Sequence, residues 1–173
     1  MNTWTQPTLP QADPIRSATM AAPLAVASSE TDVPRKKILV VDDSLVVRKL
    51  LAMKLKTSGY DVLEAADGPT AAGVVRQHKP DLMLLDIMFP ADVAHGGGGW
   101  DGFQIMKWVR QMDGGHDLPI IMITSGSAED YEPRSKAAGA VAFFHKPINN
   151  DELLNTIRVT FGDPTAAGPA PAA

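Results

Sequence analysis

Four apolar runs in this chain each end at a polar residue, and this pattern constrains the fold more than any other feature. Short apolar runs separated by helical patterns are typical of buried parallel strands. The carboxyl ends of such strands meet at one edge of an open α/β sheet, where ligands bind. We therefore expect three carboxylates, a hydroxyl and an ammonium group to converge there. The runs are residues 37–41 before Asp42 and Asp43, 82–85 before Asp86, 120–123 before Thr124, and 141–144 before His145 and Lys146.

Helical patterns alternate with these runs and with a further strand pattern at residues 60–65. Five βα repeats result, which predicts a mostly parallel sheet with right-handed crossovers and helices on both faces. Pro133 fits the fourth helix only in its first turn. We expect Met53, Met83, Met106 and Met122 to be core residues. The expected helices run from the cap Ser44 to Gly59, over 69–78, 102–112 and 131–138, and from Asn149 or Asn150 to 160.

Composition limits both the domain organisation and the possible partners. The 173 residues carry a net charge of −4 and are 45% hydrophobic, which suits one soluble domain with flanking segments. We expect a disordered arm over 1–34, a folded domain over 35–161, and a disordered Pro/Ala tail over 162–173. The lack of a basic excess argues against direct nucleic-acid binding. No apolar run is long enough for a membrane span, and the absence of cysteine is compatible with a cytoplasmic location.

The three aspartates indicate a cation site. Carboxylates brought together repel one another unless a cation or a proton offsets their charge. Hard oxygen ligands without a nearby His or Cys predict Mg²⁺ or Mn²⁺. Lys146 would then supply a point charge for a phosphate or acyl phosphate, and Thr124 could donate its hydroxyl to the same oxyanion.

At the strand ends the sequence resembles the receiver domain of two-component response regulators, including the single-domain chemotaxis type. The resemblance covers about 125 residues. It implies a flavodoxin-like, doubly wound α/β fold whose five-stranded parallel sheet has the order 2-1-3-4-5. The matching segments are VVDDS at 40–44, LLDIMFP at 84–90, MITS at 122–125, and AGA with FFHKP within 138–147.

The resemblance also implies roles for individual residues. Asp86 would be the phosphoacceptor, and Lys146 and Thr124 would contact the phosphoryl group. Phe143 occupies the aromatic switch position, where many relatives have tyrosine. The bond between Lys146 and Pro147 would be cis. Mg²⁺ would be held by Asp42, Asp43, Asp86 and the backbone carbonyl of Met88.

The implied function is that of a stand-alone phosphorylation switch rather than an enzyme. A sensor histidine kinase or a histidine phosphotransfer protein would phosphorylate Asp86. Output would be phosphorelay, or contact with a target protein through the face formed by residues 131–138, 141–144 and 149–160. One alternative is a pseudo-receiver that binds partners without phosphorylation. Another is a phosphatase with an Asp nucleophile, but such enzymes need D-x-D, and Met88 takes the place of the second carboxylate.

Two features depart from the family pattern. Residues 91–100, with glycines at 96–99, lengthen the loop after Pro90; they are either a simple insertion or a flap that carries Trp100 beside Asp86. No G-K-[ST] follows these glycines, so they are not a P-loop. In relatives, the side chains two places after the phosphoacceptor and after the Thr help to position the hydrolytic water. Met88 and Gly126 occupy these places and cannot polarise water, which predicts slow loss of the phosphoryl group.

Overall fold

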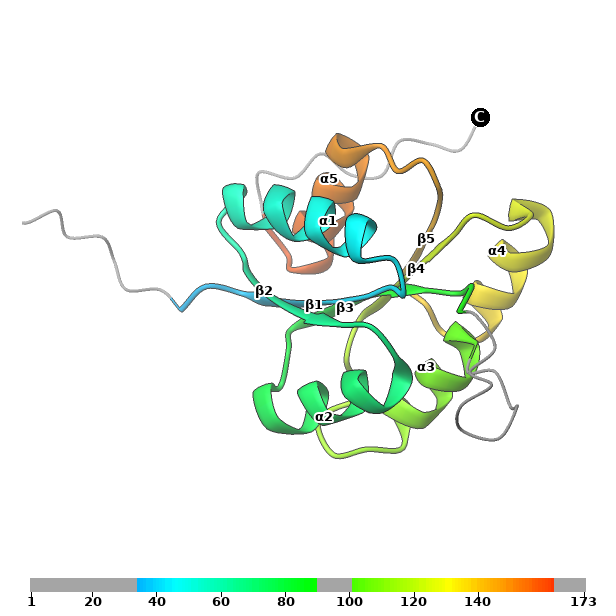
Figure 1. Ribbon diagram of the computed structural model, residues 1–173, viewed down its shortest axis with the longest axis horizontal. Coiled ribbons are helices and arrows are strands. Elements are labelled where there is room, and N and C mark those ends of the chain that lie inside the picture. The colour runs from blue at the N-terminus through cyan, green and yellow to red at the C-terminus, as the bar shows by residue number, and fades with distance from the viewer. Residues whose placement is uncertain (1–33, 90–100, 164–173) are drawn as a thin grey trace, which may run out of the picture. The chain divides into compact units, whose positions relative to one another are not determined.

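Strands and helices alternate throughout the part of the chain that the computed structural model describes, residues 34–89 and 101–163. The helices α1 and α5 lie on one face of the central sheet, and α2 and α3 lie on the other (Figure 1). The elements are β1 (Lys37–Val41), α1 (Leu45–Thr57), β2 (Asp61–Ala65), α2 (Gly68–His78), β3 (Leu82–Asp86), α3 (Gly102–Arg110), β4 (Ile120–Thr124), α4 (Ala128–Ala137), β5 (Ala142–His145) and α5 (Asn150–Thr160).

All five strands are parallel, in the order β2-β1-β3-β4-β5, which confirms the expected topology. The chain leaves β1 toward β2 on one side, whereas β3 continues toward β4 on the other. The carboxyl ends of β1 and β3 therefore flank the switch point of the sheet, where ligands bind in such folds. Val41 lies opposite Leu85, so Asp42 and Asp86 follow at the same level.

The core consists of two apolar clusters, one on each face of the sheet. Successive side chains of a strand point to opposite faces, so Leu39 belongs to one cluster while Ile38 and Val40 belong to the other. Every residue of β3 and β4 is buried. The strands therefore read as continuous apolar runs, as expected for a parallel sheet that helices cover on both faces.

Helix caps confirm most of the expected boundaries. Ser44 accepts a hydrogen bond from the backbone N–H of Val47, and Asn149 accepts from Asp151 and Glu152. Gly59 has φ +92°, a backbone conformation that favours glycine after a helix. The helix expected over 102–112 ends at Arg110.

The prediction for the fourth helix was wrong at its start. Helix α4 begins at Ala128 rather than at 131, because Ser127 caps it by accepting a hydrogen bond from the N–H of Asp130. Glu129 and Asp130 add favourable negative charge to its first turn. Pro133 therefore lies inside the helix, where its missing N–H removes the bond that the Glu129 carbonyl would otherwise accept.

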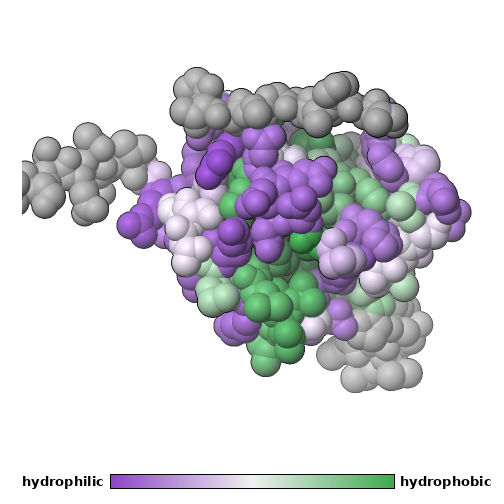
Figure 2. Space-filling view, turned by 90° about the horizontal axis from the view of Figure 1, so that it is seen from above, coloured by the Kyte–Doolittle hydropathy of each residue, from purple (hydrophilic) through white to green (hydrophobic). Residues whose placement is uncertain are grey.

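The prediction that Met53 is a core residue was also wrong, whereas Met83, Met106 and Met122 are buried. Met53 is 61% exposed. Helix α1 has apolar side chains over more of its circumference than the face it packs on the sheet. Figure 2, which views the molecule from the side of α1 and α5, shows a contiguous hydrophobic area. We define the α1 surface as the exposed side chains of Leu45, Val46, Leu50 and Met53.

Several sequence predictions fall outside the described residues. These are the disordered arm up to residue 33, the insertion 91–100 with its possible flap, and the tail from residue 164. Within the described ranges, no helix has the length and apolar character required to cross a membrane.

The position of Pro133 predicts a stabilising substitution. Pro133→Ala restores one backbone hydrogen bond and relieves the ring's steric conflict, so it should raise the free energy of unfolding by about 1 to 3 kcal/mol. Pro69→Ala is the matched control, because Pro69 lies in the first turn of α2, where its missing N–H costs no helical bond. Urea unfolding should show a gain for the first variant alone; equal stabilities of Pro133→Ala and the wild type would contradict this account.

Candidate functional site

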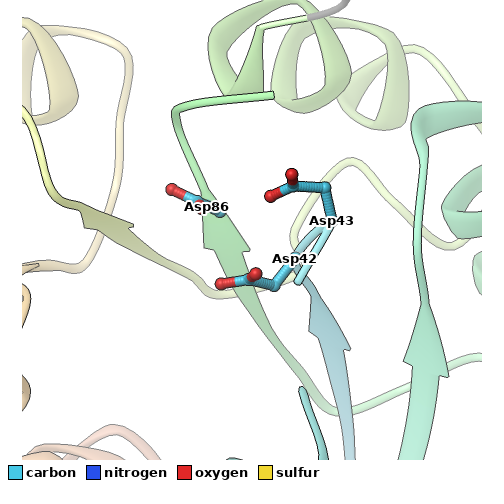
Figure 3. A group of neighbouring side chains, drawn as sticks. All are labelled: Asp42, Asp43 and Asp86. Carbon is cyan, nitrogen blue, oxygen red and sulfur yellow. The ribbon is translucent and has the colours of Figure 1, made fainter. Parts of the chain in front are cut away.

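The three predicted aspartates converge at the carboxyl ends of β1 and β3 (Figure 3). One carboxylate oxygen from each of Asp42, Asp43 and Asp86 lies within 4.8 Å of the others. Asp42 and Asp86 are buried, at 2% and 3% exposure, whereas Asp43 is exposed. This arrangement brings acidic charge together in a site that is largely excluded from water.

Local hydrogen bonds fix the loop that carries Asp42 and Asp43. Asp42 Oδ1 accepts from the backbone N–H of Ser44 at 2.9 Å, which ties the carboxylate to the start of α1. The Arg48 guanidinium donates to the backbone carbonyls of Asp42 at 2.6 Å and Asp43 at 3.0 Å. Arg48 was not among the residues predicted from the sequence, although its place one helical turn after the cap Ser44 directs it back toward this loop.

Lys146 reaches the aspartates from the other side of the site. Its backbone N–H donates to the carbonyl of Thr124, and its peptide bond to Pro147 is cis, as predicted. Its ammonium Nζ donates to Asp42 Oδ2 at 2.7 Å and to Asp86 Oδ2 at 2.6 Å. One cation therefore bridges two buried carboxylates that come from different strands.

Burial dominates the electrostatics of this bridge. It raises the pKa of Asp86, because the effect of desolvation exceeds the opposing effects of Lys146 and of the Met88 N–H. Burial alone would lower the pKa of Lys146, but its hydrogen bonds to Asp42 and Asp86 and their charges raise that pKa above its ordinary value. Lys146 thus remains protonated, whereas its charge offsets only part of the desolvation cost of ionised Asp86.

Thr124 and Phe143 lie on the neighbouring strands. Thr124 is fully buried, and its hydroxyl oxygen accepts from the backbone N–H of Gly126 at 3.0 Å. Phe143 is half-buried and packs against the core cluster on the α2 and α3 side. The roles that we expect for these two residues, phosphoryl sensing and aromatic switching, remain predictions.

Met88 follows Asp86 by two residues and also contacts it. Its backbone N–H donates to Asp86 Oδ1 at 3.1 Å, and its side chain is 46% exposed. The coordinating role that we expect for its backbone carbonyl is likewise still a prediction.

The donor set fits a hard divalent cation. Asp42, Asp43 and Asp86 offer carboxylate oxygens only, and a neighbouring positive charge would offset the cost of ionising buried Asp86. Mg²⁺ prefers this kind of site, with one or two protein carboxylates and the remaining positions filled by water or phosphate oxygens. The residues present are thus suited to Mg²⁺ or Mn²⁺.

Comparison with known proteins places this geometry in a family. The family model described as the response regulator receiver domain matches residues 38–158. The polar-differentiation response regulator DivK of Brucella anthropi is 30% identical over 128 residues, which cover 74% of this chain and 98% of that protein. The phosphate regulon transcriptional regulatory protein PhoB of Pseudomonas aeruginosa is 33% identical, over 71% of this chain but 50% of that protein.

Solved structures agree with this result. The chemotaxis protein CheY4 of Vibrio cholerae has a TM-score of 0.64 and 30% identity, and the match covers 73% of this chain and 98% of that one. A putative response regulator of Chloroflexus aurantiacus has a TM-score of 0.65 and 29% identity, over 74% and 98% of the two chains. The family match extends from β1 into α5 and includes every predicted site residue, and on this ground the chain belongs to the response regulator receiver domain family.

Proposed function

We propose that this chain accepts a phosphoryl group on Asp86 from a histidine kinase or a histidine phosphotransfer protein. The observation that carries the proposal is the bridge from Lys146 Nζ to Asp86 and Asp42, beside the buried hydroxyl of Thr124. A pseudo-receiver would have no use for this bridge, because burying and pairing these charges is costly and a well-packed apolar cluster would be at least as stable. The bridge therefore supports phosphoryl chemistry over a purely structural module.

Each residue of the site would have a distinct role in an in-line transfer of the phosphoryl group. An oxygen of Asp86 attacks the phosphorus as the bond to the donor nitrogen breaks, and the electron pair of that bond leaves with the donor histidine. Lys146 is placed to neutralise charge on the transferring group, since its ammonium already contacts Asp86. Asp42, Asp43, Asp86 and the Met88 carbonyl would hold Mg²⁺, which supplies further neutralisation of the phosphoryl oxygens when bound. The reaction ends at the aspartyl phosphate, so the chain acts as a switch rather than as a turnover enzyme.

Phosphorylation changes the charge and the hydrogen-bonding needs at one point. The carboxylate becomes a group with nearly two negative charges and new acceptor oxygens. Thr124 can turn its hydroxyl to these oxygens, and a shift of the segment after it would leave room for Phe143 to move inward. We propose that the face formed by α4, β5 and α5 reports this change to a downstream protein.

A small phosphodonor tests the phosphoacceptor directly. In Mg²⁺ with phosphoramidate, intact-protein mass spectrometry should show one added phosphoryl group on the wild type and none on Asp86→Asn. Lys146→Ala should be labelled at least about a hundredfold more slowly, because it loses a preorganised charge. Asp81→Asn is the control, since Asp81 pairs with Lys36 away from the site. Full labelling of Asp86→Asn would refute Asp86 as the acceptor and favour another residue.

A protein donor needs a docking surface next to Asp86, and the α1 surface is suited to this purpose. A groove of about 520 Å³ runs from Leu50 and Met53 on α1 to Lys146, Pro147 and Ile148. Lys146 thus belongs both to the groove and to the phosphoacceptor site. An exposed apolar patch of this kind favours a protein partner. We propose that the protein carrying the phosphohistidine docks on the α1 surface.

Comparing a protein phosphodonor with phosphoramidate separates an effect on docking from an effect on the chemical step. With a phosphorylated histidine protein that labels the wild type, Leu50→Glu combined with Met53→Glu should slow transfer by about tenfold or more. The rate with phosphoramidate should stay unchanged, because neither residue contacts Asp86. Val141→Glu is a matched control, because Val141 is 51% exposed on another part of the surface. Unchanged transfer from the protein donor would show that it docks elsewhere.

The raised pKa of Asp86 also predicts a stability effect. Its folded-state pKa lies above its unfolded value, so ionising Asp86 costs stability, and this cost is fully present above the folded pKa. Without divalent cations, Asp86→Asn should raise the free energy of unfolding near neutral pH, because the neutral amide avoids the desolvation cost of the buried carboxylate. The advantage should shrink as pH falls through the folded pKa and vanish below the ordinary carboxyl pKa. Urea unfolding as a function of pH measures it; a variant less stable than the wild type at neutral pH would contradict this prediction.

A further inference from the structure

Tyr131 on α4 links the two segments that follow Asp86 and Thr124. Its hydroxyl donates to the Met88 sulfur at 3.6 Å, and the backbone N–H of Met88 in turn donates to Asp86. Its ring lies against Gly126, whose N–H donates to the Thr124 hydroxyl oxygen. One side chain therefore contacts both residues that lie two positions beyond the phosphoacceptor and beyond the buried threonine.

The contact with Gly126 depends on the absence of a side chain there. A Cβ at position 126 would lie 2.5 Å from Cε2 of Tyr131, closer than such atoms can approach. The Tyr131 ring therefore fills the volume that a side chain at 126 would occupy. The ring lies beside the segment that follows Thr124, and Asp86 and Thr124 are themselves almost fully buried.

A second set of contacts, with Phe103 on α3 and Arg134 on α4, also holds the Tyr131 ring in this position. Its ring stacks on Phe103 of α3, with centroids 6.3 Å apart and an interplanar angle of 21°. The Arg134 guanidinium lies 4.3 Å from the Phe103 centroid and 5.6 Å from that of Tyr131. The ring is thus packed between Phe103 of α3 and the segments that follow Asp86 and Thr124.

We propose that Tyr131 is a positioning residue that restricts access to the phosphoryl position at Asp86. It thereby slows both the phosphorylation of Asp86 and the hydrolysis of the aspartyl phosphate. The donor's leaving group in phosphorylation and the attacking water in hydrolysis each occupy the face of the phosphorus opposite the Asp86 oxygen, because both displacements proceed in line. A side chain that fixes Met88 and Gly126 around this face limits both reactions together. This inference rests on the proposed function of Asp86 and names a determinant of its kinetics.

Two rate constants test the proposal: labelling by phosphoramidate with Mg²⁺, and decay of the phosphoprotein after removal of the donor. Tyr131→Ala should raise both by about five-fold, the change that a barrier lower by roughly 1 kcal/mol gives. A merely structural loss would slow labelling, because a loosened site positions Lys146 and Asp86 less well. Tyr131→Phe keeps the ring against Gly126 and should restore most of the wild-type decay time.

The chain's other tyrosine, Tyr60, provides a matched control. It packs on Phe161, with ring centroids 5.9 Å apart, and it lies outside the phosphoacceptor site. Tyr60→Ala should leave both rate constants unchanged at a temperature where circular dichroism shows every variant folded. Equal effects of Tyr60→Ala and Tyr131→Ala would overturn the proposal.

Gly126 offers an independent route to the same contact. Gly126→Ala should displace the Tyr131 ring and accelerate decay by a similar factor. Because both changes remove one contact, the double variant should decay no faster than either single one. Multiplied effects, or wild-type decay in Tyr131→Ala, would overturn this inference while leaving Asp86 as the acceptor. A wild type that takes up no label would instead overturn the proposed function, and this inference with it.

Discussion

The ammonium of Lys146, held between the carboxylates of Asp42 and Asp86, is the interaction on which the rest of the site depends. Two buried carboxylates close to one another repel, and Lys146 offsets that repulsion without removing the desolvation cost of Asp86. The site therefore has unused capacity for positive charge, which a divalent cation can supply. An incoming phosphoryl group can compete for Lys146 because the ammonium is already in place. A carboxylate whose charge is only partly offset lowers the stability of the fold, and such groups are typical of functional sites.

Much of this site could be predicted from the sequence, because parallel topology converts sequence position into spatial position. An apolar run fixes a buried strand, and the residue that follows it is carried to the carboxyl edge of the sheet. Asp42, Asp86 and Thr124 needed no further information to be brought together. Lys146 follows the same rule, because it comes directly after β5 and its backbone N–H donates to the carbonyl of Thr124 at the end of β4.

The features that could not be predicted depend on competition between local and tertiary effects. Helix α4 contains Pro133 in its interior because it begins after the cap Ser127, three residues earlier than expected. The apolar pattern of α1 did not distinguish Met53 from the side chains that face the sheet, since nothing in a single helix shows how wide its buried face is. Tyr131 was missed because its contacts with Met88, Phe103 and Gly126 join separate elements. A glycine five residues before an aromatic residue is a weak signal without the fold.

In the proposed function, the docking of the donor and the control of access to the phosphorus involve different parts of the site. The groove beside α1 shares Lys146 with the site, so a donor bound there would meet the ammonium that neutralises the transferring group. Tyr131 reaches the site from α4, and there it contacts Met88 and Gly126, which carry no charge. On the proposal made above, a change at Tyr131 alters access to the phosphorus without altering the charge balance at Asp86. If the proposed function and the proposed role of Tyr131 hold, rates of phosphorylation and decay can vary through Tyr131 while Asp42, Asp86 and Lys146 stay constant.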